Sequence, residues 1–370
     1  MRLATFNLEN MFDRAKAINA SNWALGKPAL EAHQQLNSLF AKEVYSQTDQ
    51  EKIIKLFKEQ GLLNSDVGPW LTLRKIRGSL IKRPRSGEPE IVASGRKSWI
   101  GWVELKTEAV NEEATRNTAR TLKAVAADVQ AVVEAEDRGT LRMFNAQVLK
   151  SLDATAFDHI MLIDGNDERG IDVGLMTRQN YPIISMRSHI DDEDEQGPIF
   201  SRDCAEFEVA LPSGDSLWVL VNHFKSKGYG SPASNNAKRK RQAARVRELY
   251  EQHLVDGHSY VAVLGDLNDT PDSDPMSPLL GLGSTLKDIS SHPSYDGQGR
   301  EGTHGNCTPS GKLDYILLSP ALYSQVSAAG IERRGMWGGV NGTLWPRFDE
   351  LTSADQAASD HAALWVDLAD

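Results

Sequence analysis

The residue types best suited to chemistry stand at 266–269, where Asp266, Asn268 and Asp269 follow an apolar run and a glycine. The run 260–264 is short and apolar, which predicts a buried strand, and Gly265 then lets the backbone turn. Carboxylates at the end of a buried strand cost free energy unless they bind a cation or accept hydrogen bonds. Strand ends are also where α/β proteins place their active sites. We therefore expect a polar site at this edge of a sheet.

The same arrangement recurs along the chain, because five more predicted strands end or begin at a polar group. In mixed and antiparallel sheets, the end of one strand lies beside the start of its neighbour, so all these groups can share one rim. Taken alone, each residue is about as well explained by a turn, a helix cap or a satisfied core position; the set as a whole favours chemistry. The strand-end groups are Asn7, Glu134, His223, Asp266 with Asn268, Asp314, and Asp360 with His361.

These residue types fit a hard cation and a phosphate ester. Glutamate and asparagine oxygens suit Mg²⁺ or Mn²⁺, whereas zinc sites use more cysteine and histidine. A histidine beside an aspartate is held in one tautomer and stabilised as a cation. A second aspartate can orient or deprotonate water. Such a site meets the needs of phosphate-ester hydrolysis, in which a water is positioned and developing charge is neutralised.

The elements that must position these groups alternate between strands and helices. Apolar spacing predicts helices over 29–40, 50–61, 115–126 and 141–152, and a weak helix over 279–289. The segments 205–211 and 216–221 flank Pro-Ser-Gly-Asp and predict a β-hairpin. A second hairpin is predicted from 91–93 and 99–105.

Two basic stretches have alternative interpretations. The segment 74–85 carries six of the chain's Lys and Arg residues, and a solvated loop explains it better than phosphate contact. The predicted helix over 237–247 has one basic face that either is solvated or contacts phosphate. The acidic segment 191–195 is predicted to be a solvated loop.

Composition limits the class of protein. The 370 residues are 40% apolar and 25% charged, as in an ordinary globular chain. The net charge of −10 argues against bulk electrostatic capture of nucleic acid. The two cysteines form no metal-type cluster, no apolar run approaches the length of a membrane span, and the first residues lack a signal-peptide core. We expect a cytoplasmic protein with no membrane association, built as one domain over 1–370 with an insertion at about 14–115.

The ordered motifs resemble those of the endonuclease/exonuclease/phosphatase superfamily, which includes AP endonucleases, pancreatic-type deoxyribonucleases, sphingomyelinases and inositol-polyphosphate 5-phosphatases. Each motif is weak alone, but together they occur in the family's order and span nearly the whole chain. The matching motifs are Thr5-Phe-Asn7-Leu-Glu9-Asn10, Asp128-Val-Gln-Ala-Val-Val-Glu134, Val221-Asn-His223, Gly265-Asp266-Leu-Asn268, Leu313-Asp314-Tyr315-Ile and Ser359-Asp360-His361.

The resemblance implies an α/β fold: a four-layer α/β sandwich, in which two mixed β-sheets pack face to face with helices outside. It also implies a role for each site residue. For the metal, the resemblance implies Asn7 and Glu134 as ligands, with Asp360 as a further ligand. For the reaction, it implies that Asp266 orients or activates the attacking water and that Asn268 holds the phosphate. It also implies that His361 pairs with Asp314 and that His223 stabilises phosphoryl oxygens or assists the leaving group. Asp172 and Arg202 are secondary candidates, for which a structural role is favoured.

The resemblance implies a Mg²⁺- or Mn²⁺-dependent phosphodiester hydrolase, and we expect an endonuclease or exonuclease acting on DNA or RNA. The alternatives are a phosphatase or phospholipid/sugar phosphodiesterase of the same superfamily, and a catalytically inactive binding scaffold. The chain departs from the family pattern at Val133, where a glutamine is usual before the metal glutamate, and in the length of the 14–115 insertion.

Overall fold

The computed structural model describes residues 1–9, 11–17, 23–167, 169–228 and 230–369. The chain divides into two compact units, each with a hydrophobic core of its own. Unit 1 comprises Met1–Phe12, Val110–Lys227 and Ser231–Asp370, and unit 2 comprises Asp13–Ala109 and Gly228–Gly230.

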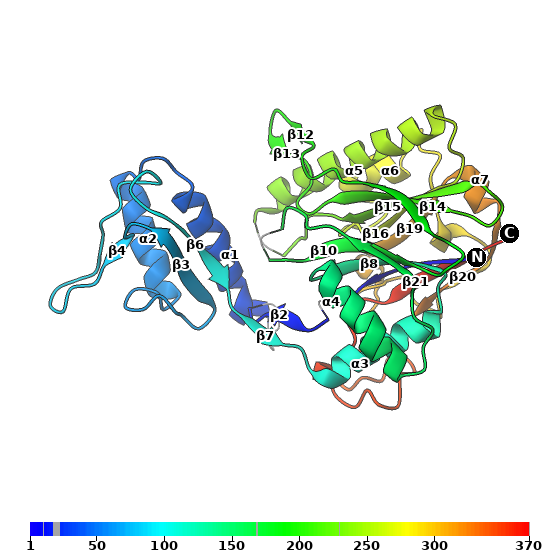
Figure 1. The fold of residues 1–370 in the computed structure, drawn as a ribbon, viewed down its shortest axis with the longest axis horizontal. Coiled ribbons are helices and arrows are strands. Elements are labelled where there is room, and N and C mark those ends of the chain that lie inside the picture. Colours follow the sequence, from blue (N-terminus) through cyan, green and yellow to red (C-terminus); the bar gives the residue numbers. More distant parts are fainter. Residues whose placement is uncertain (10, 18–22, 168, 229, 370) are drawn as a thin grey trace. The chain divides into compact units, whose positions relative to one another are not determined.

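Unit 1 contains two large mixed sheets (Figure 1). The pairs β1–β8 and β15–β16 are parallel, while β1–β21, β8–β10, β14–β15 and β16–β19 are antiparallel. The seven-stranded sheet runs in the order β18 (Tyr295–Asp296), β20 (Val326–Glu332), β21 (Ala363–Leu368), β1 (Arg2–Asn7), β8 (Val129–Ala135), β10 (Asp172–Thr177) and β9 (His159–Leu162). The six-stranded sheet runs in the order β11 (Ile183–Arg187), β14 (Cys204–Ala210), β15 (Ser216–His223), β16 (Val261–Asp266), β19 (Asp314–Leu318) and β17 (Lys287–Asp288).

Alternation along the strands explains why the sheets pack face to face. In β1, Leu3 faces the core between the sheets, whereas Ala4 and Phe6 belong to a second apolar cluster on the opposite face. In a strand, successive side chains point to opposite faces, so a strand that is apolar throughout must be covered on both. The core between the sheets also includes Val129, Ala131, Val133, Val219, Val221, Ala262, Leu264 and Ile316.

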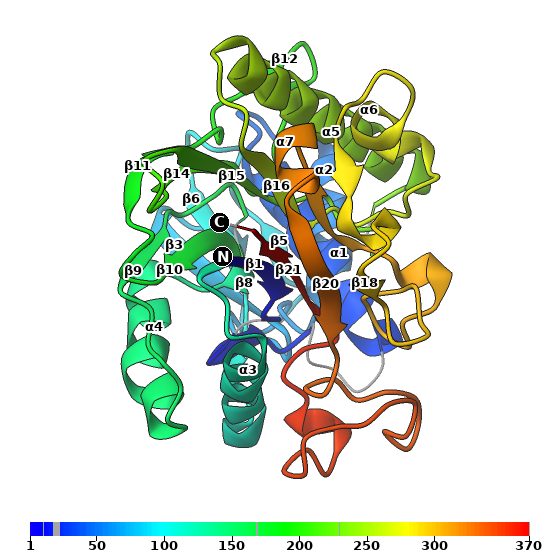
Figure 2. The ribbon, with the colours of Figure 1, turned by 90° about the vertical axis from the view of Figure 1, so that its right-hand side faces the viewer.

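Helices cover the outer faces of both sheets (Figure 1 and Figure 2). On the seven-stranded sheet these are α3 (Glu112–Val125) and α4 (Arg138–Met143), which continues as the π-helix Phe144–Leu149. On the six-stranded sheet they are α5 (Pro232–Val255) and α6 (Ser277–Leu280). The four-layer α/β sandwich with two mixed sheets is therefore confirmed.

Shorter elements complete unit 1. They are β12 (Glu193–Asp194), β13 (Gly197–Pro198), α7 (Pro320–Tyr323) and the 3₁₀ turns Asp274–Met276, Ile289–Ser291, Pro309–Gly311 and Ala354–Gln356. The ends of the unit meet, because the amino group of Met1 donates a hydrogen bond of 2.9 Å to the carbonyl of Leu368.

Unit 2 has its own small fold. It contains two helices, α1 (Trp23–Phe40) and α2 (Gln47–Glu59). Its strands form short antiparallel pairs: β2 (Asp13–Ala15) with β7 (Thr107–Ala109), β3 (Leu71–Arg77) with β6 (Ile100–Leu105), and β4 (Ile81–Lys82) with β5 (Glu90–Ile91). Its core joins apolar residues of both helices to the inward face of β3 and β6.

Several local predictions were wrong. The segments 91–93 and 99–105 do not pair with each other, because β5 pairs with β4 and β6 pairs with β3. The region 279–289 is not one helix but contains the end of α6, all of β17 and the start of the 3₁₀ turn at Ile289. The prediction of a helix over 141–152 was right, although this helix begins earlier, at Arg138, and is partly a π-helix. The acidic segment 191–195 contributes a short strand, β12, rather than a loop alone. Pairing partners depend on residues far apart in the sequence, so local patterns could not select them.

Among the described helices, none has the length and apolar character that crossing a membrane requires.

Gly265 has a different role from the one predicted. The strand does not turn there but continues to Asp266. Gly265 has φ +121°, and a Cβ atom at this position would lie 2.0 Å from the carbonyl oxygen of Asn222 on β15. Only glycine allows the two parallel strands to approach this closely.

We expect Gly265→Ala to lower the free energy of unfolding by about 3 kcal/mol or more, because the added methyl group must separate β15 from β16 at an unfavourable φ. Urea denaturation measures the change. Gly214→Ala is the matched control: Gly214 has φ +93°, and a Cβ atom there would have no heavy atom within 4 Å. It should cost only about 1 kcal/mol, and equal losses in the two variants would contradict the steric explanation.

Candidate active site

Three neighbouring strands of the six-stranded sheet place His223, Asp266 and Asp314 in one row. His223 of β15 pairs in register with Asp266 of β16, and Asp266 pairs with Asp314 of β19. All three residues are buried, with exposed fractions of 1–2%. The strand ends predicted from the sequence thus meet at one edge of this sheet.

The facing sheet contributes Asn7 and Glu134. Asn7 ends β1, and its Nδ2 donates a hydrogen bond of 3.3 Å to Oδ2 of Asp266. Glu134 lies within β8 rather than after it, at a register shift opposite Asp172 and Val173. Its φ of +59° is unusual for a residue with a side chain. A bulge of this kind redirects a side chain, and Oε1 of Glu134 lies 3.5 Å from Nε2 of His223.

The site is centred on Oδ2 of Asp266. Asn268 Nδ2 donates to this oxygen at 3.0 Å and to the carbonyl of Phe224 at 3.2 Å. The Nε2 atoms of His223 and His361 lie 3.7 and 3.9 Å from the same oxygen. Both amide hydrogens of Asn268 are therefore directed at protein acceptors, and the backbone reaches this geometry through a left-handed φ of +56°.

His361 is fixed by Asp314. The Nδ1 atom of His361 donates to Oδ2 of Asp314 at 2.8 Å, and the hydroxyl of Thr303 donates to the same oxygen at 2.6 Å. Burial alone would lower the pKa of His361, but the Asp314 and Asp360 carboxylates outweigh it and hold this pKa well above its ordinary value. His361 is thus a cation that presents Nε2 to the site.

His223 has the opposite character. Burial, reinforced by the guanidinium groups of Arg202 and Arg169, holds the pKa of His223 well below its ordinary value. Its Nδ1 is buried and has no hydrogen-bond partner among the described residues. The site therefore combines one neutral and one cationic imidazole, whose environments separate their proton affinities.

Asp360 lies on the exposed side of the site. One of its carboxylate oxygens is 3.1 Å from Nε2 of His304, and the other is 3.7 Å from Nε2 of His361. Its backbone N–H donates to Oε2 of Glu9 at 3.0 Å. The structure thus places Asp360 beside the two histidines, while Glu134 lies beside His223.

Three residues of the site escaped the sequence analysis: Glu9, Thr303 and His304. Glu9 stood within the first motif without a role, and its own N–H donates to Oδ1 of Asn7 at 3.0 Å. Thr303 and His304 belong to a polar, glycine-rich loop with no periodic pattern. The one available signal was that this loop leads directly into the strand of Asp314.

The secondary candidates support the site from behind. Arg202 forms an ion pair of 2.7 Å with Asp167 and donates to the carbonyl of Phe224, which also accepts from Asn268. Asp172 accepts a hydrogen bond from the backbone of Gly165, and burial raises the pKa of Asp172 to about 7. These contacts fit a positioning role for both residues.

The donor set suits a hard divalent cation. Burial raises the pKa of Asp266, and among its neighbours His361 lowers this pKa while Asp314 and Glu134 raise it. Close carboxylates of this kind repel each other unless positive charge is added. Carboxylate and amide oxygens from Glu134 and Asn7 provide the ligand type that Mg²⁺ and Mn²⁺ prefer. Among the described residues, two groups place their ligand atoms within 4.8 Å of one another: Asp266, Asp314 and His361, and His304, Asp360 and His361.

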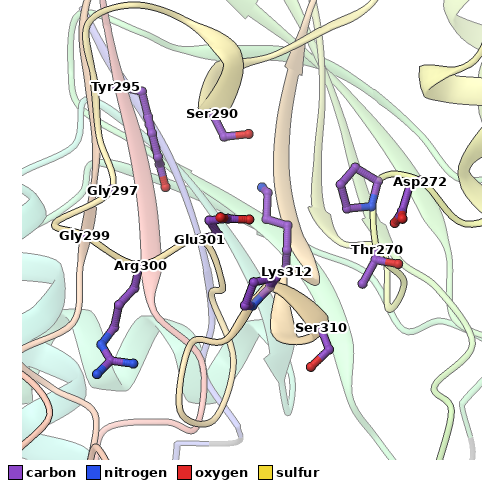
Figure 3. A pocket seen from close by; sticks show the side chains of 12 residues that line it. Thr270, Asp272, Ser290, Tyr295, Gly297, Gly299, Arg300, Glu301, Ser310 and Lys312 are labelled. Carbon is purple, nitrogen blue, oxygen red and sulfur yellow. The ribbon is translucent and has the colours of Figure 1, made fainter.

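A cavity of about 840 Å³ opens beyond the end of β16 and the start of β19 (Figure 3). It is lined by the loop after Asn268 and the loop before Asp314, so it adjoins the site along the chain. Figure 3 shows the side chains of Tyr295, Glu301 and Lys312 directed into the same space. The hydroxyl of Tyr295 is buried without a hydrogen-bond partner among the described residues. The Nζ atom of Lys312 already donates to the carbonyl of Asp314 and pairs with Asp288, so the exposed carboxylates of Asp272 and Glu301 are the groups that remain open to a ligand.

Most cations of α5 are paired with acidic side chains, which favours the solvated interpretation of 237–247. The buried Arg239 pairs with Asp269, and Lys240 pairs with Asp274. Lys238 donates to the carbonyl of Pro198 instead. The remaining pairs are Arg241 with Asp194, Arg245 with Asp192 and Arg247 with Glu251. A phosphate would have to displace an acidic partner at each of these positions.

Comparison with known proteins identifies the fold. A model of the endonuclease/exonuclease/phosphatase family matches residues 109–361. No curated protein sequence matches the chain. Among solved structures, a mannosyl-6-phosphatase of Bacteroides thetaiotaomicron has a TM-score of 0.50 at 16% identity, over 70% of this chain and 92% of that chain. At this identity the similarity supports the fold alone.

Two further solved structures are similar at lower scores. The human Nocturnin catalytic domain with bound sulfate has a TM-score of 0.49 at 17% identity, over 71% of this chain and 88% of that chain. Truncated TDP2 of Caenorhabditis elegans has a TM-score of 0.47 at 15% identity, over 68% of this chain and 89% of that chain.

We expect Mg²⁺ or Mn²⁺ to raise the melting temperature, because a cation that binds only the folded chain stabilises it by about 2.7 kcal/mol at 100 times its Kd. Differential scanning fluorimetry measures the shift. Glu134→Ala should remove most of it. Glu195→Ala, which removes an exposed carboxylate from the 191–195 segment, is the control and should retain it. A full shift in Glu134→Ala would mean that Glu134 does not bind the metal.

Proposed function

The chain belongs to the endonuclease/exonuclease/phosphatase family, whose members are phosphoester hydrolases, and on that premise we propose that it is a Mg²⁺- or Mn²⁺-dependent phosphodiesterase acting on nucleic acid. The observation that best supports the proposal is the convergence of side chains from both sheets on Oδ2 of Asp266. Groups that bring a metal, a water and a phosphate together must lie within a few ångströms of one point.

In this proposal, Asn7 and Glu134 hold the cation, and Asp360 is a further ligand from the exposed side. When bound, the cation neutralises charge on the phosphoryl oxygens as a Lewis acid. Asn7 and Glu134 stand on neighbouring strands of the seven-stranded sheet, and the contact of Asn7 with Asp266 places them beside the carboxylate of the facing sheet.

The protein's own groups orient the water and stabilise the phosphate. Asp266 accepts from Asn7 and Asn268, and its carboxylate orients the attacking water. Because both amide hydrogens of Asn268 are used within the protein, we assign Asn268 to positioning Asp266 rather than to holding the phosphate. The His361 cation, held by Asp314, donates from Nε2 to a phosphoryl or leaving oxygen.

Charge distribution favours a polyanionic substrate. Asp13–Ala109 contains 16 Lys and Arg residues against 11 Asp and Glu, whereas the rest of the chain contains 25 against 40. Unit 2 is therefore basic although the net charge of the whole chain is −10. A basic surface attracts nucleic acid.

The cavity beside the site favours a second candidate function. The exposed Glu301 and Asp272 line it, whereas Ser290 and Lys312 already pair with Asp288. Carboxylates repel a polynucleotide but accept hydrogen bonds from hydroxyl groups. A phosphatase or phosphodiesterase acting on a hydroxyl-rich substrate, such as a sugar or inositol phosphate, is the alternative.

Cleavage assays separate the two functions. Single- and double-stranded DNA, RNA, an inositol phosphate and a sugar phosphate are each incubated with Mg²⁺ or Mn²⁺. The proposal expects metal-dependent cleavage of at least one nucleic acid. Turnover of a hydroxyl-rich phosphate with no cleavage of any nucleic acid would replace it by the alternative.

We expect Asp266→Ala and His361→Ala each to reduce kcat/KM by at least about 10²-fold while the chain stays folded, because each removes a group that acts on water or phosphate. Circular dichroism checks the fold. Asp215→Ala is the control, since Asp215 lies in the β14–β15 turn at the opposite end of β15 from His223. Full activity in both site variants would overturn the assignment.

Glu301→Ala tests what the cavity binds. For a hydroxyl-rich substrate we expect KM to rise several-fold with kcat nearly unchanged, because a ground-state hydrogen-bond acceptor is lost. For a polynucleotide we expect KM to stay constant or fall, because a repulsive charge is removed. Steady-state kinetics on both substrate classes distinguishes the outcomes, and a fall in kcat alone would fit neither use of the cavity.

A further inference from the structure

The paired strands β3 and β6 of unit 2 carry an exposed aromatic side chain among cations on their outer face. Leu71 and Leu73 of β3 and Val103 of β6 point into the unit's core with α1 and α2. The alternate residues point away from it, and Arg74 lies directly opposite Trp102 in the register. Trp102 is 39% exposed. We call this surface, made of Thr72, Arg74, Trp102 and Glu104, the Trp102 face.

Glu104 holds the two main side chains of this face in place. One carboxylate oxygen accepts from Nε1 of Trp102 at 2.9 Å, and the other accepts from Nε of Arg74 at 2.6 Å. The indole edge is thereby fixed while its ring remains partly exposed. The ion pair uses Nε of Arg74, so the terminal amino groups of a guanidinium that is 57% exposed are left for an anion.

Further cations are exposed in unit 2. Arg77 lies opposite Ile100 in the register and so shares the face of Trp102, whereas Lys75 lies opposite Gly101 on the other face and Arg85 lies on the β4–β5 connection. Within the described part of the chain, none of these three has an acidic group at ion-pair distance, unlike most cations of α5. The unit as a whole has an excess of five positive charges, 16 against 11. Its surface charge is therefore available to an outside anion.

We propose that the Trp102 face binds single-stranded nucleic acid. An unpaired base stacks on the indole of Trp102, and Arg74 and Arg77 contact the flanking phosphates. An aromatic platform beside cations is the usual means of binding a single strand, because every base has a face that stacks and every linkage carries a charge. A duplex keeps its bases stacked inside and offers no base to one exposed indole.

The inference would extend the proposed function by giving the chain a second contact with its substrate, outside the catalytic groups. A tethered contact raises the effective concentration of the strand near the chain without altering the chemistry. The binding itself does not require hydrolysis, so the two proposals can fail separately.

The test is binding of a fluorescein-labelled oligothymidylate of about 20 nucleotides to the full chain in EDTA, which prevents metal-dependent cleavage. Fluorescence anisotropy is recorded over a range of salt concentrations. We expect Trp102→Ala to weaken binding at least about fivefold, the order that loss of one stacked base gives, and Trp102→Phe to retain most of the affinity. Arg74→Glu with Arg77→Glu should weaken binding further and make its salt dependence shallower by roughly 0.7 per lost phosphate contact.

The matched control is Lys52→Glu with Lys58→Glu, on exposed positions of α2. This helix packs on the other face of the paired strands β3 and β6. It changes the net charge equally and should leave the Kd within about twofold. Circular dichroism shows that each variant is folded. Any of four results would overturn the proposal. They are wild-type affinity in Trp102→Ala, an equal loss of affinity in the control, no binding by the wild type, and tighter binding of a duplex than of a single strand. Binding without any cleavage would refute only the proposed nuclease activity.

Discussion

The buried carboxylate of Asp266 is the interaction on which the rest of the site depends. A charge removed from water is costly unless hydrogen bonds and opposite charges surround it. In this protein Asn7 and Asn268 donate to the same carboxylate oxygen, and the cationic His361 stands nearby. Each of these partners comes from a different part of the chain. Compensating one buried charge therefore requires groups from both sheets at their common edge.

That compensation uses backbone geometry that few residues adopt readily. Glu134 and Asn268 both have left-handed φ values, and Gly265 allows a strand contact that any side chain would prevent. Such conformations cost about 1 to 3 kcal/mol each and persist only where the surrounding structure enforces them. The extensive apolar core between the sheets supplies this enforcement. The stability of the sandwich and the preorganisation of the site therefore depend on the same packing.

The two histidines of the site differ in charge because their environments differ. Both are buried, yet His361 beside Asp314 is cationic, whereas His223 near Arg202 is neutral. Burial lowers both pKa values; for His361 the carboxylates of Asp314 and Asp360 outweigh it, whereas for His223 the guanidinium groups of Arg202 and Arg169 add to it. A site with one cationic and one neutral imidazole can stabilise anionic oxygens without repelling a metal ion on the opposite side.

The sequence by itself determined the fold class, the family and most of the residues that meet at the site. It did so because short apolar runs followed by polar groups mark strand ends, and their order along the chain carries the family pattern. Only the tertiary structure decided which strands of unit 2 pair with each other and that Thr303 and His304 join the site. It also decided that most cations of α5 are already paired with acidic side chains. These outcomes depend on contacts between residues far apart in the chain, which local composition and spacing do not encode.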